Sequence, residues 1–232
     1  MPQETEIKLK ITDAKALALA LKKLKAELLS KARPKVHEMN VLFDHPDGTL
    51  AGRGELLRVR TETAGPLSAG KSRKSRAGKS GQTNWQQRVV LTYKRPTQED
   101  DPETISGRGV AKYKIREELE LELSNAGTIS KILEGLGMDG WFRYEKYRAT
   151  YQLPKSAPWA KGLLIELDET PVGTFVELEG PIPAIDRAAA ALGFSKKDYI
   201  AKSYLQLYLE SEQGRGERPR QMLFAPAKPP RK

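Results

Sequence analysis

The chain of 232 residues contains no cysteine. A disulfide framework, a thiolate zinc site and a thiol nucleophile are therefore excluded. Histidine is scarce as well, since His37 and His45 are the only two, which argues against a histidine-based metal centre or a Ser-His-Asp triad. No apolar run approaches the roughly 20 residues of a membrane span. Met1 leads directly into charged residues, so we expect a soluble, cytoplasmic protein without a membrane partner.

The net charge of +10 is concentrated in two segments. Residues 63–88 carry six basic side chains and no acid, and residues 213–232 carry six basic side chains and one acid. Both are rich in Gly, Ser or Pro, a composition that cannot bury enough apolar surface to order itself. We therefore expect one domain over residues 1–211 with a flexible basic insert at 63–88, followed by a disordered basic tail at 212–232. The rest of the chain is nearly neutral, which argues against a nucleic-acid partner.

Alternating charged and apolar residues predict a protein dominated by strands. The expected strands are 3–11, 36–44, 55–62, 89–95, 112–123, 141–153, 163–168 and 175–179. Helical spacing of leucines and alanines predicts helices over 13–30, about 124–137, 182–192 and 196–211. Eight strands are enough to close a barrel, so the sequence allows an α+β fold in which an antiparallel barrel has helices outside.

The first strand, residues 3–11, carries the most informative pattern in the sequence. Side chains alternate between the two faces of a strand, so Glu4, Glu6 and Lys8 share one face, opposite Ile7 and Leu9. Two carboxylates and an ammonium in one row are the groups needed to hold a divalent cation beside a phosphate.

Later strands repeat this separation of a charged face from an apolar face. The charged positions are Arg58 and Arg60, Lys94 beside Thr92, Arg116 with Glu118, Glu120 and Glu122, Lys146 and Arg148, Glu166 and Asp168, and Glu177 and Glu179. An antiparallel sheet with one solvated face also produces such alternation. However, like charges lie two residues apart on these strands and would repel each other without counter-ions. A closed barrel with these faces inward would enclose a polar tunnel.

Such a tunnel needs a ligand of matching charge. Arginine and lysine suit a polyanion, since guanidinium groups fork onto phosphate oxygens. Paired carboxylates suit Mg²⁺ or Mn²⁺, hard cations that bridge to phosphates. The two sets together predict a metal–polyphosphate complex. Phosphoryl chemistry relies on positioning and charge neutralisation, so the lack of Cys and the shortage of His do not weaken this interpretation.

In this order, the segments resemble the CYTH domain family, also called triphosphate tunnel metalloenzymes. The resemblance covers roughly residues 3–210 and is carried by Glu4-x-Glu6-x-Lys8, LFDHPDGTL (42–50), LLRVR (56–60), LTYKRP (91–96), REELELEL (116–123), KYR (146–148), ELDE (166–169), FVELEG (175–180) and YIAKSYLQL (199–207). It implies an eight-stranded antiparallel closed β-barrel, a triphosphate tunnel, with helices packed outside. The last segment is similar to the terminal helix of bacterial class IV adenylyl cyclase-like members.

The resemblance also implies roles for individual residues. The metal ligands would be Glu4, Glu6, Glu118, Glu120, Asp168, Glu177 and Glu179. The triphosphate clamp would be Lys8, Arg58, Arg60, Lys94, Arg116, Lys146 and Arg148. Catalysis would centre on Glu4, Glu6 and Lys8, with Lys8 acting near the nucleophile as a base or as a phosphate ligand. Glu122 and Glu166 are equally compatible with salt-bridge partners near the tunnel mouth.

Two reactions fit this site, and the sequence leaves them open. A class IV adenylyl cyclase-like enzyme converts ATP to cyclic AMP and pyrophosphate, whereas a triphosphatase hydrolyses tripolyphosphate, thiamine triphosphate or a nucleoside triphosphate. Both use Mg²⁺ or Mn²⁺. A non-catalytic binder of polyphosphate or nucleic acid is a third interpretation, and a homodimer is also left open.

A second phosphate-binding motif occurs at residues 65–72, where GPLSAGKS matches the P-loop pattern. A P-loop leads from a strand into a helix whose N-terminal amides hold the phosphate. The segment that follows has two glycines, many charges and no apolar face, so we expect a solvated linker here.

Overall fold

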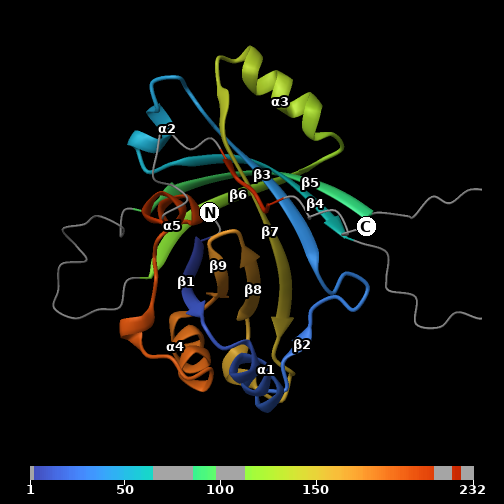
Figure 1. The fold of residues 1–232 in the computed structure, drawn as a ribbon, viewed down its shortest axis with the longest axis vertical. Helices are drawn as coiled ribbons and strands as arrows, with labels where there is room; N and C mark the ends of the chain where they lie inside the picture. The colour runs from blue at the N-terminus through green and yellow to red at the C-terminus, as the bar shows by residue number, and fades with distance from the viewer. Residues whose placement is uncertain (1–2, 65–85, 98–112, 212–220, 226–232) are drawn as a thin grey trace, which may run out of the picture.

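Figure 1 shows the fold in a computed structural model, which describes residues 3–64, 86–97, 113–211 and 221–225. Eight strands form its centre: β1 (Gln3–Ile11), β3 (Val36–Asp44), β4 (Leu56–Ala64), β5 (Gln86–Pro96), β6 (Lys114–Leu123), β7 (Asp139–Gln152), β8 (Leu164–Thr170) and β9 (Gly173–Glu179). They pair in the order β7-β3-β4-β5-β6-β1-β9-β8, and β8 pairs back onto β7. All these pairings are antiparallel. The expected eight-stranded closed barrel is confirmed.

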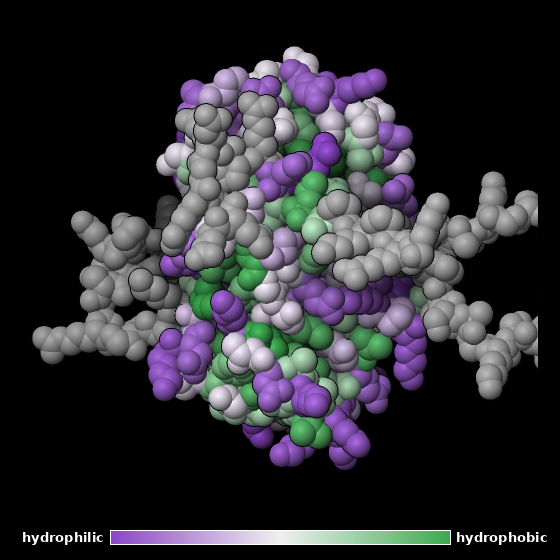
Figure 2. All heavy atoms as spheres, in the orientation of Figure 1, coloured by the Kyte–Doolittle hydropathy of each residue, from purple (hydrophilic) through white to green (hydrophobic). Residues whose placement is uncertain are grey.

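The barrel carries its apolar side chains on the outside, where helices cover them. Helices α1 (Ala14–Lys23) and α4 (Ile182–Ala191) pack against the outer faces of β1, β8 and β9, around Ile7, Ile165 and Leu178. Helix α3 (Ala126–Gly135) covers β3, β4 and β5 through Leu133. On the face in view, hydrophilic and hydrophobic side chains are interspersed (Figure 2). None of the helices in the described ranges has the length and apolar character to cross a membrane.

Burial on β1 shows which face points inward. Ile7 and Leu9 are completely buried under the outer helices, while Glu6 and Lys8 on the opposite face are only 7% and 2% exposed. A solvated sheet face would leave those charges in water. The closed ring instead encloses them, so the structure favours the tunnel over the solvated sheet.

One end of the barrel is filled by aromatic side chains. Helix α5 (Tyr204–Glu210) and the two-residue strand β10 (Gln221–Met222) bring Tyr204, Tyr208 and Met222 against Leu42 and Phe175, which point inward from β3 and β9. The short helix α2 (Thr49–Gly52) lies at the same end, between β3 and β4. Apolar packing therefore covers part of this end.

The prediction of one helix over 13–30 was wrong beyond residue 23. The Asp13 carboxylate caps α1 by accepting the backbone N–H groups of Lys15 and Ala16, but the helix ends at Lys23, and Lys25 adopts a left-handed φ of 53°. The chain then forms β2 (Glu27–Leu28), which pairs with the end of β7. Leucines at helical spacing continue to Leu28, but hydrogen bonds to an available strand edge outweigh that local preference.

The prediction of a helix over 196–211 was also wrong in part. A 3-10 turn at Lys196–Asp198 precedes an extended crossing in which Ile200 exchanges both backbone hydrogen bonds with Lys8, each 2.9 Å long. Helix α5 begins only at Tyr204, where Ser203 and Gln206 form a capping box. Pairing with β1 therefore replaces the first turns of the expected helix.

Some residues that the sequence assigns to flexible segments belong to strands. Residues 63–64 belong to β4 and 86–88 belong to β5, while the P-loop-like motif at 65–72 lies outside the described residues. The tail prediction was wrong for residues 221–225, because β10 pairs in parallel with Arg143 and Tyr144 of β7. The backbone N–H of Phe224 also donates to Glu145 Oε1, 2.6 Å away.

Met222 provides a test of this tail contact, because its side chain is only 1% exposed. We expect Met222→Ala to lower the free energy of unfolding by about 2–4 kcal/mol, as large-to-small changes in a packed core do. Gln221→Ala is the matched control, since Gln221 is exposed on the same short strand. Urea unfolding measures both, and equal, small effects would show that the segment does not contribute to the fold.

Candidate functional site

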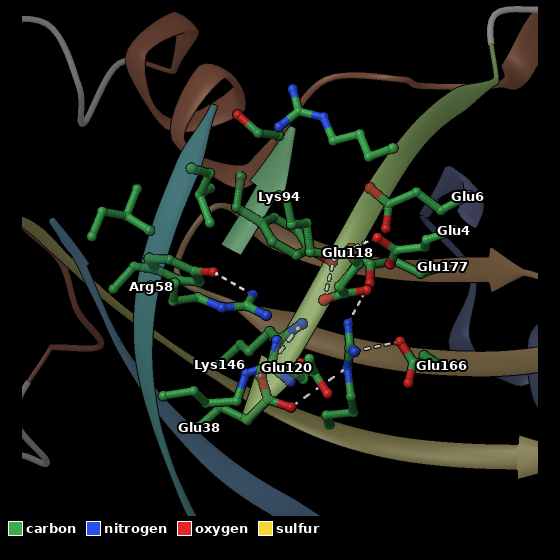
Figure 3. Close-up of a pocket in the computed structure, with 18 of the residues that line it drawn as sticks. Glu4, Glu6, Glu38, Arg58, Lys94, Glu118, Glu120, Lys146, Glu166 and Glu177 are labelled. Atoms are coloured by element: carbon green, nitrogen blue, oxygen red, sulfur yellow. Dashed lines mark hydrogen bonds and ion pairs between the residues drawn. The ribbon is translucent and has the colours of Figure 1, made fainter. Parts of the chain in front are cut away.

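The barrel interior holds a cavity of about 680 Å³, lined by charged side chains from all eight strands (Figure 3). Its basic lining residues are Lys8, Arg33, Arg58, Arg60, Arg88, Lys94, Lys114, Arg116, Lys146 and Arg148. Its acidic lining residues are Glu4, Glu6, Glu38, Asp44, Glu55, Glu62, Glu118, Glu120, Glu166, Glu177 and Glu179. Ten bases and eleven acids leave the lining close to neutral, so a highly charged anion would need additional cations to enter with it.

The β1 row lies at the centre of this lining. Lys8 Nζ is 3.1 Å from Glu6 Oε1 and 3.1 Å from Glu177 Oε1, and Lys114 Nζ is 2.6 Å from Glu6 Oε1. Burial opposes ionisation of Glu6, but the ammonium groups of Lys114 and Lys8 hold its pKa below the usual value. Burial likewise opposes protonation of Lys8, but Glu177 and Glu6 raise its pKa. This favours Lys8 as a fixed cation over Lys8 as a base.

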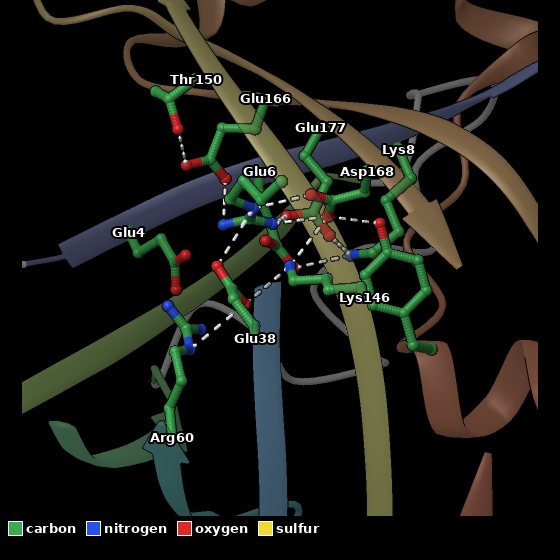
Figure 4. A network of polar contacts seen from close by, with 12 residues as sticks. Glu4, Glu6, Lys8, Glu38, Arg60, Lys146, Thr150, Glu166, Asp168 and Glu177 are labelled. Carbon is green, nitrogen blue, oxygen red and sulfur yellow. Dashed lines mark hydrogen bonds and ion pairs between the residues drawn. The ribbon is translucent and has the colours of Figure 1, made fainter. Parts of the chain in front are cut away.

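A second cluster surrounds Arg148 on β7, and Figure 4 shows its acidic members Glu166, Asp168 and Glu177. The Arg148 guanidinium bonds Asp168 at 2.7 and 2.6 Å and also contacts Glu166 and Glu177. Several carboxylates thus share one cation. Burial raises the pKa of Glu166 to about 8, with Arg148 opposing and Glu177 and Asp168 adding to the rise.

Asp168 lies behind these cations and does not line the cavity. It is completely buried and accepts hydrogen bonds from Arg148, from Lys146 Nζ at 2.8 Å and from Tyr204 Oη at 2.7 Å. These contacts link β8, β7 and α5. The family resemblance implied that Asp168 is a metal ligand. In the structure its carboxylate instead contacts Lys146 and Arg148 and does not face the cavity.

Glu38 on β3 was missed in the sequence. It is 2% exposed and lies 3.4 Å from Arg60 Nε, 3.6 Å from Lys146 Nζ and 3.7 Å from Arg148 Nε. Burial opposes its ionisation, but Arg60, Lys146 and Arg148 keep its pKa low. Strand alternation could have identified Glu38, because Glu38 and Asn40 occupy one face of β3 and Met39 and Val41 occupy the other.

Arg58 is the buried cation whose own pairing is incomplete. It is 7% exposed and donates to neutral oxygens, Tyr144 Oη at 3.3 Å and Thr92 Oγ1 at 3.2 Å. Within the described residues, Arg58 and Arg116 have no carboxylate oxygen within 4 Å, whereas the other eight basic lining residues do. The Nε of Arg58 also has no hydrogen-bond partner there.

Burial opposes the charge of Arg58, but Tyr144, Glu38 and Glu118 raise its pKa, the two carboxylates acting from beyond 4 Å. Because no carboxylate of the described residues contacts the guanidinium directly, a bound anion would supply a closer partner.

The carboxylates of three adjacent strands have the chemistry of a site for a hard cation. Burial and Glu4 raise the pKa of Glu179 to about 7. Burial also raises the pKa of Glu118, with Glu4 contributing, although the Lys94 ammonium lies 3.1 Å away and contacts Glu4 as well. In the described part of the chain, no group of three His, Asp or Glu side chains is close enough to hold a metal ion as it stands. Mutually repelling carboxylate oxygens still fit Mg²⁺ or Mn²⁺.

The raised pKa of Glu179 predicts how stability changes with pH. Since its folded value, about 7, exceeds the reference value of 4.5, the folded state holds the proton longer than the unfolded state does. Stability should therefore fall by at most about 3 kcal/mol as the pH rises from about 4.5 to 7. Glu179→Gln should remove this loss and be more stable than the wild type at about pH 8 in chelator. Urea unfolding of the wild type and Glu179→Gln at about pH 4.5 and about pH 8 measures the effect.

Glu169→Gln is the control for this measurement, because Glu169 is an exposed acid on the adjacent strand β8. Its substitution should leave the pH dependence as in the wild type. If Glu179→Gln keeps the full pH-dependent loss, the repulsion around Glu179 is absent from the protein in solution.

The structure brings together most of the residues selected from the sequence. Thirteen of the fourteen line the one cavity, and Asp168 lies directly behind it. Glu122 pairs with Arg88 at 3.0 Å, while Glu166 both lines the cavity and pairs with Arg148. The cavity lining also includes residues that were not predicted, among them Lys114, which shares the face of Arg116, and Tyr204, whose place in the tunnel depends on the path of the chain before α5.

A protein-family model matches nearly the whole sequence. The model for the CYTH domain aligns with residues 2–204. The chain belongs to the CYTH family. Its members are triphosphate-processing enzymes, and a tunnel of paired acids and bases agrees with that class of substrate. Comparison with curated protein sequences gives no match.

Solved structures share the CYTH fold with this chain. PH1819 from Pyrococcus horikoshii has a TM-score of 0.61 and 23% identity, covering 89% of this chain and 98% of its own. A candidate adenylate cyclase from Vibrio parahaemolyticus has a TM-score of 0.60 and 16% identity, covering 88% and 96%. HpAC1 from Hippeastrum, described as having a dominant triphosphatase activity, has a TM-score of 0.51 and 22% identity, covering 88% and 94%.

Proposed function

We propose that this CYTH protein is a divalent-metal-dependent enzyme that breaks a phosphoanhydride bond of a triphosphate bound inside the tunnel. The observation that carries the proposal is Arg58, a buried guanidinium that faces the cavity without a carboxylate partner in the described residues. A phosphate oxygen is the kind of acceptor that completes such a group.

The other basic residues surround the same space. Lys8, Lys146 and Arg148 come from adjacent parts of the barrel, and each is already oriented by a carboxylate. Fixed ion pairs keep these cations at defined positions, so little reorganisation is required when the substrate binds. The acids prevent the cations from repelling one another before the ligand arrives.

Metal binding is supported by the charge balance of the lining. Glu4, Glu6, Glu118 and Glu179 are the residues we assign to holding Mg²⁺ or Mn²⁺, with Glu120 and Glu177 next to them. When bound, the cation supplies the positive charge that neutralises phosphate oxygens. Asp168 and Glu38 are assigned to orienting Lys146, Arg148 and Arg60, because their carboxylates contact those cations directly.

The residues of the chain itself have three tasks in this proposal. Arg58 and Arg60 bind phosphate oxygens from β4, and Lys146 and Arg148 do so from β7. Lys8, held between Glu6 and Glu177, stabilises charge near the phosphorus that is attacked. The closed barrel limits the approach of bulk water, which strengthens each of these interactions.

The proposed reaction is the class IV adenylyl cyclase-like one. The ribose 3′-hydroxyl of ATP attacks the α-phosphorus, a new P–O bond forms, the bond to the β-phosphate oxygen breaks, and pyrophosphate leaves as the hydroxyl proton is lost. The second candidate is hydrolysis, in which water attacks the terminal phosphorus, the bond from that phosphorus to the bridging oxygen breaks, the diphosphate leaves, and orthophosphate is the other product. The triphosphatase activity described for HpAC1 favours keeping this candidate.

Product analysis tests the proposal. Purified protein is incubated with ATP, thiamine triphosphate and tripolyphosphate in Mg²⁺, in Mn²⁺ and in chelator, and the products are separated by chromatography. We expect turnover that chelator abolishes. Cyclic AMP with pyrophosphate would identify the cyclase, and orthophosphate would identify the hydrolase. Binding of these ligands without any turnover would support the non-catalytic binder instead.

A further inference from the structure

An aspartate on the outside of the barrel joins two tyrosines that are far apart in the chain. Asp186 lies on α4, and its Oδ1 accepts hydrogen bonds from Tyr113 Oη and, at 2.9 Å, from Tyr199 Oη. The two tyrosine rings pack edge to face with their centres 5.9 Å apart. The exposed Lys196 Nζ lies 2.9 Å from Oδ2 of the same carboxylate. The proposed function uses none of these four residues.

The charge states of the three groups suit this arrangement. Burial opposes ionisation of Asp186, but hydrogen bonds from Tyr113, Lys196 and Tyr199 hold its pKa below the usual value. Burial and the Asp186 carboxylate raise the pKa of both tyrosines. At neutral pH the carboxylate is therefore an ionised acceptor, and both hydroxyls keep the proton that they donate. Hydrogen bonds to a charged acceptor are the stronger kind.

The first tyrosine is next to a residue that contacts Glu6 inside the tunnel. Tyr113 immediately precedes Lys114, the first residue of β6, and Lys114 Nζ is 2.6 Å from Glu6 Oε1. Successive side chains of an extended chain point to opposite sides, and accordingly Tyr113 packs against the outer apolar cluster while Lys114 lines the cavity. Fixing Tyr113 outside the barrel therefore restrains the ammonium group that contacts Glu6.

The second tyrosine is next to a residue that contacts Lys8. Tyr199 immediately precedes Ile200, whose backbone N–H and C=O both bond the backbone of Lys8, each at 2.9 Å. The same segment leads to Tyr204, whose ring centre is 5.2 Å from Lys8 Nζ. The chain from Tyr199 to Tyr204 thus contacts Lys8 at its backbone and at its ammonium group.

Helix α4 gives these hydrogen bonds a fixed base. It lies beside β1 (Figure 1), and its residues Ile185, Ala188 and Ala189 are completely buried in the same cluster as Ile7 of β1. Side chains in a close-packed core have little room to shift. Asp186, next to Ile185 in the helix, is therefore held at a defined position relative to β1.

We propose that Asp186 is a positioning residue for the tunnel, which acts through Tyr113 and Tyr199 to hold Glu6 and Lys8 in the geometry that triphosphate turnover requires. This inference rests on the proposed function. A small displacement of a group near the reaction lowers the rate strongly, so a contact outside the barrel can control the rate without touching the substrate.

The first measurement follows the backbone contact and requires no turnover. Hydrogen exchange of the Lys8 and Ile200 amides is recorded in chelator for the wild type, Asp186→Ala, Asp186→Asn and Tyr199→Phe. We expect exchange at both amides to be at least about tenfold faster in Asp186→Ala and Tyr199→Phe, because local opening of this contact becomes easier. Asp186→Asn keeps an oxygen where both hydroxyls bond, so its exchange should stay within about threefold of the wild type.

The second measurement is steady-state kinetics of the same variants across a Mg²⁺ titration. We expect Asp186→Ala to lower kcat for the preferred triphosphate by about tenfold, with a smaller change in KM, because the basic residues that bind phosphate stay in place. It should also raise the Mg²⁺ concentration for half-maximal activity, since Glu6 is an assigned metal ligand. Tyr113→Phe should raise this Mg²⁺ requirement too, whereas Asp186→Asn should restore most of the rate.

Arg187→Ala is the matched control on the same helix. Arg187 is the exposed residue after Asp186, and its guanidinium lies 4.5 Å from the ring centre of Trp159. This substitution should change neither the exchange of the Lys8 amide nor kcat by more than about twofold. If Asp186→Ala does not fold, Tyr113→Phe and Tyr199→Phe decide the outcome, because each removes only one hydroxyl.

Two results would overturn the inference while leaving the proposed function intact. One is exchange at Lys8 and Ile200 that stays as in the wild type when the tyrosine contacts are removed. The other is faster exchange with an unchanged kcat and an unchanged Mg²⁺ requirement, which would mean that Asp186 serves the fold alone. A wild type that turns over none of the triphosphates would instead remove the proposed function, and the positioning role with it, whatever the exchange rates.

Discussion

Glu6→Gln is expected to lower kcat/KM for the preferred triphosphate by about 10²–10³ in saturating Mg²⁺, the range found when one preorganised electrostatic group is removed. Glutamine keeps the size of the side chain but removes the charge that pairs with Lys8 at 3.1 Å and Lys114 at 2.6 Å. It also removes an assigned metal ligand. The concentration of Mg²⁺ needed for half-maximal activity should rise, and steady-state kinetics across a Mg²⁺ titration measure both quantities.

The control for Glu6 is Glu122→Gln. Glu122 is an acid on β6 that pairs with Arg88 and is largely exposed. Its substitution should change kcat/KM by less than about twofold, because exposed ion pairs contribute little. Circular dichroism and urea unfolding establish that both variants are folded. An unchanged kcat/KM and an unchanged Mg²⁺ requirement in Glu6→Gln would contradict the assignment of Glu6 to the metal site.

Arg58→Met is expected to change function and stability in opposite directions. Without ligand, methionine removes a buried charge that has no carboxylate within 4 Å in the described residues, so the free energy of unfolding should rise by about 1–3 kcal/mol. The same change removes a phosphate contact, so kcat/KM for the triphosphate should fall at least about 100-fold. Urea unfolding in chelator and steady-state kinetics measure the two effects.

Arg143→Met is the matched control, since Arg143 is exposed on β7. Arg143→Met should change neither the free energy of unfolding nor kcat/KM measurably. Added tripolyphosphate should stabilise the wild type and Arg143→Met more than Arg58→Met, because a ligand that binds only the folded state adds its binding energy to stability. If Arg58→Met is destabilised in the absence of ligand, Arg58 serves the fold and the central observation behind the proposed function is lost.

The strands could be predicted because the alternation of charged and apolar residues shows which side chains lie on each face of a strand. Glu4, Glu6 and Lys8 alternate with Ile7 and Leu9, and this alternation fixes which side chains share a wall whatever the register. That is why nearly all of the selected residues line one cavity. Asp168 fits the pattern but is covered by Lys146, Arg148 and Tyr204, since alternation places a residue on a face without saying what lies in front of it.

The remaining errors come from contacts between distant segments. Leu24 and Leu28 continue the helical spacing of α1, yet residues 27–28 pair with the edge of β7. Ile200 leaves its expected helix to bond Lys8 on β1. Met222 lies in a segment without a hydrophobic pattern, yet it fills the space between β7 and α5. In each case a free strand edge or an open core position decided the structure, and neither is visible in the local sequence.

The sequence alone determined the charged and apolar faces and the eight strands of the barrel, and it indicated the class of ligand that such faces suit, because a two-residue period and the chemistry of side chains are local properties. Only the tertiary structure decided that Arg58 lacks a carboxylate partner within the described residues and that Glu38 lies among three cations. These facts depend on distances between strands that are far apart in the chain. Closure of the barrel sets those distances, since it pairs β3 with β7 and β1 with both β6 and β9, and each charge is left with the neighbours that the ring allows.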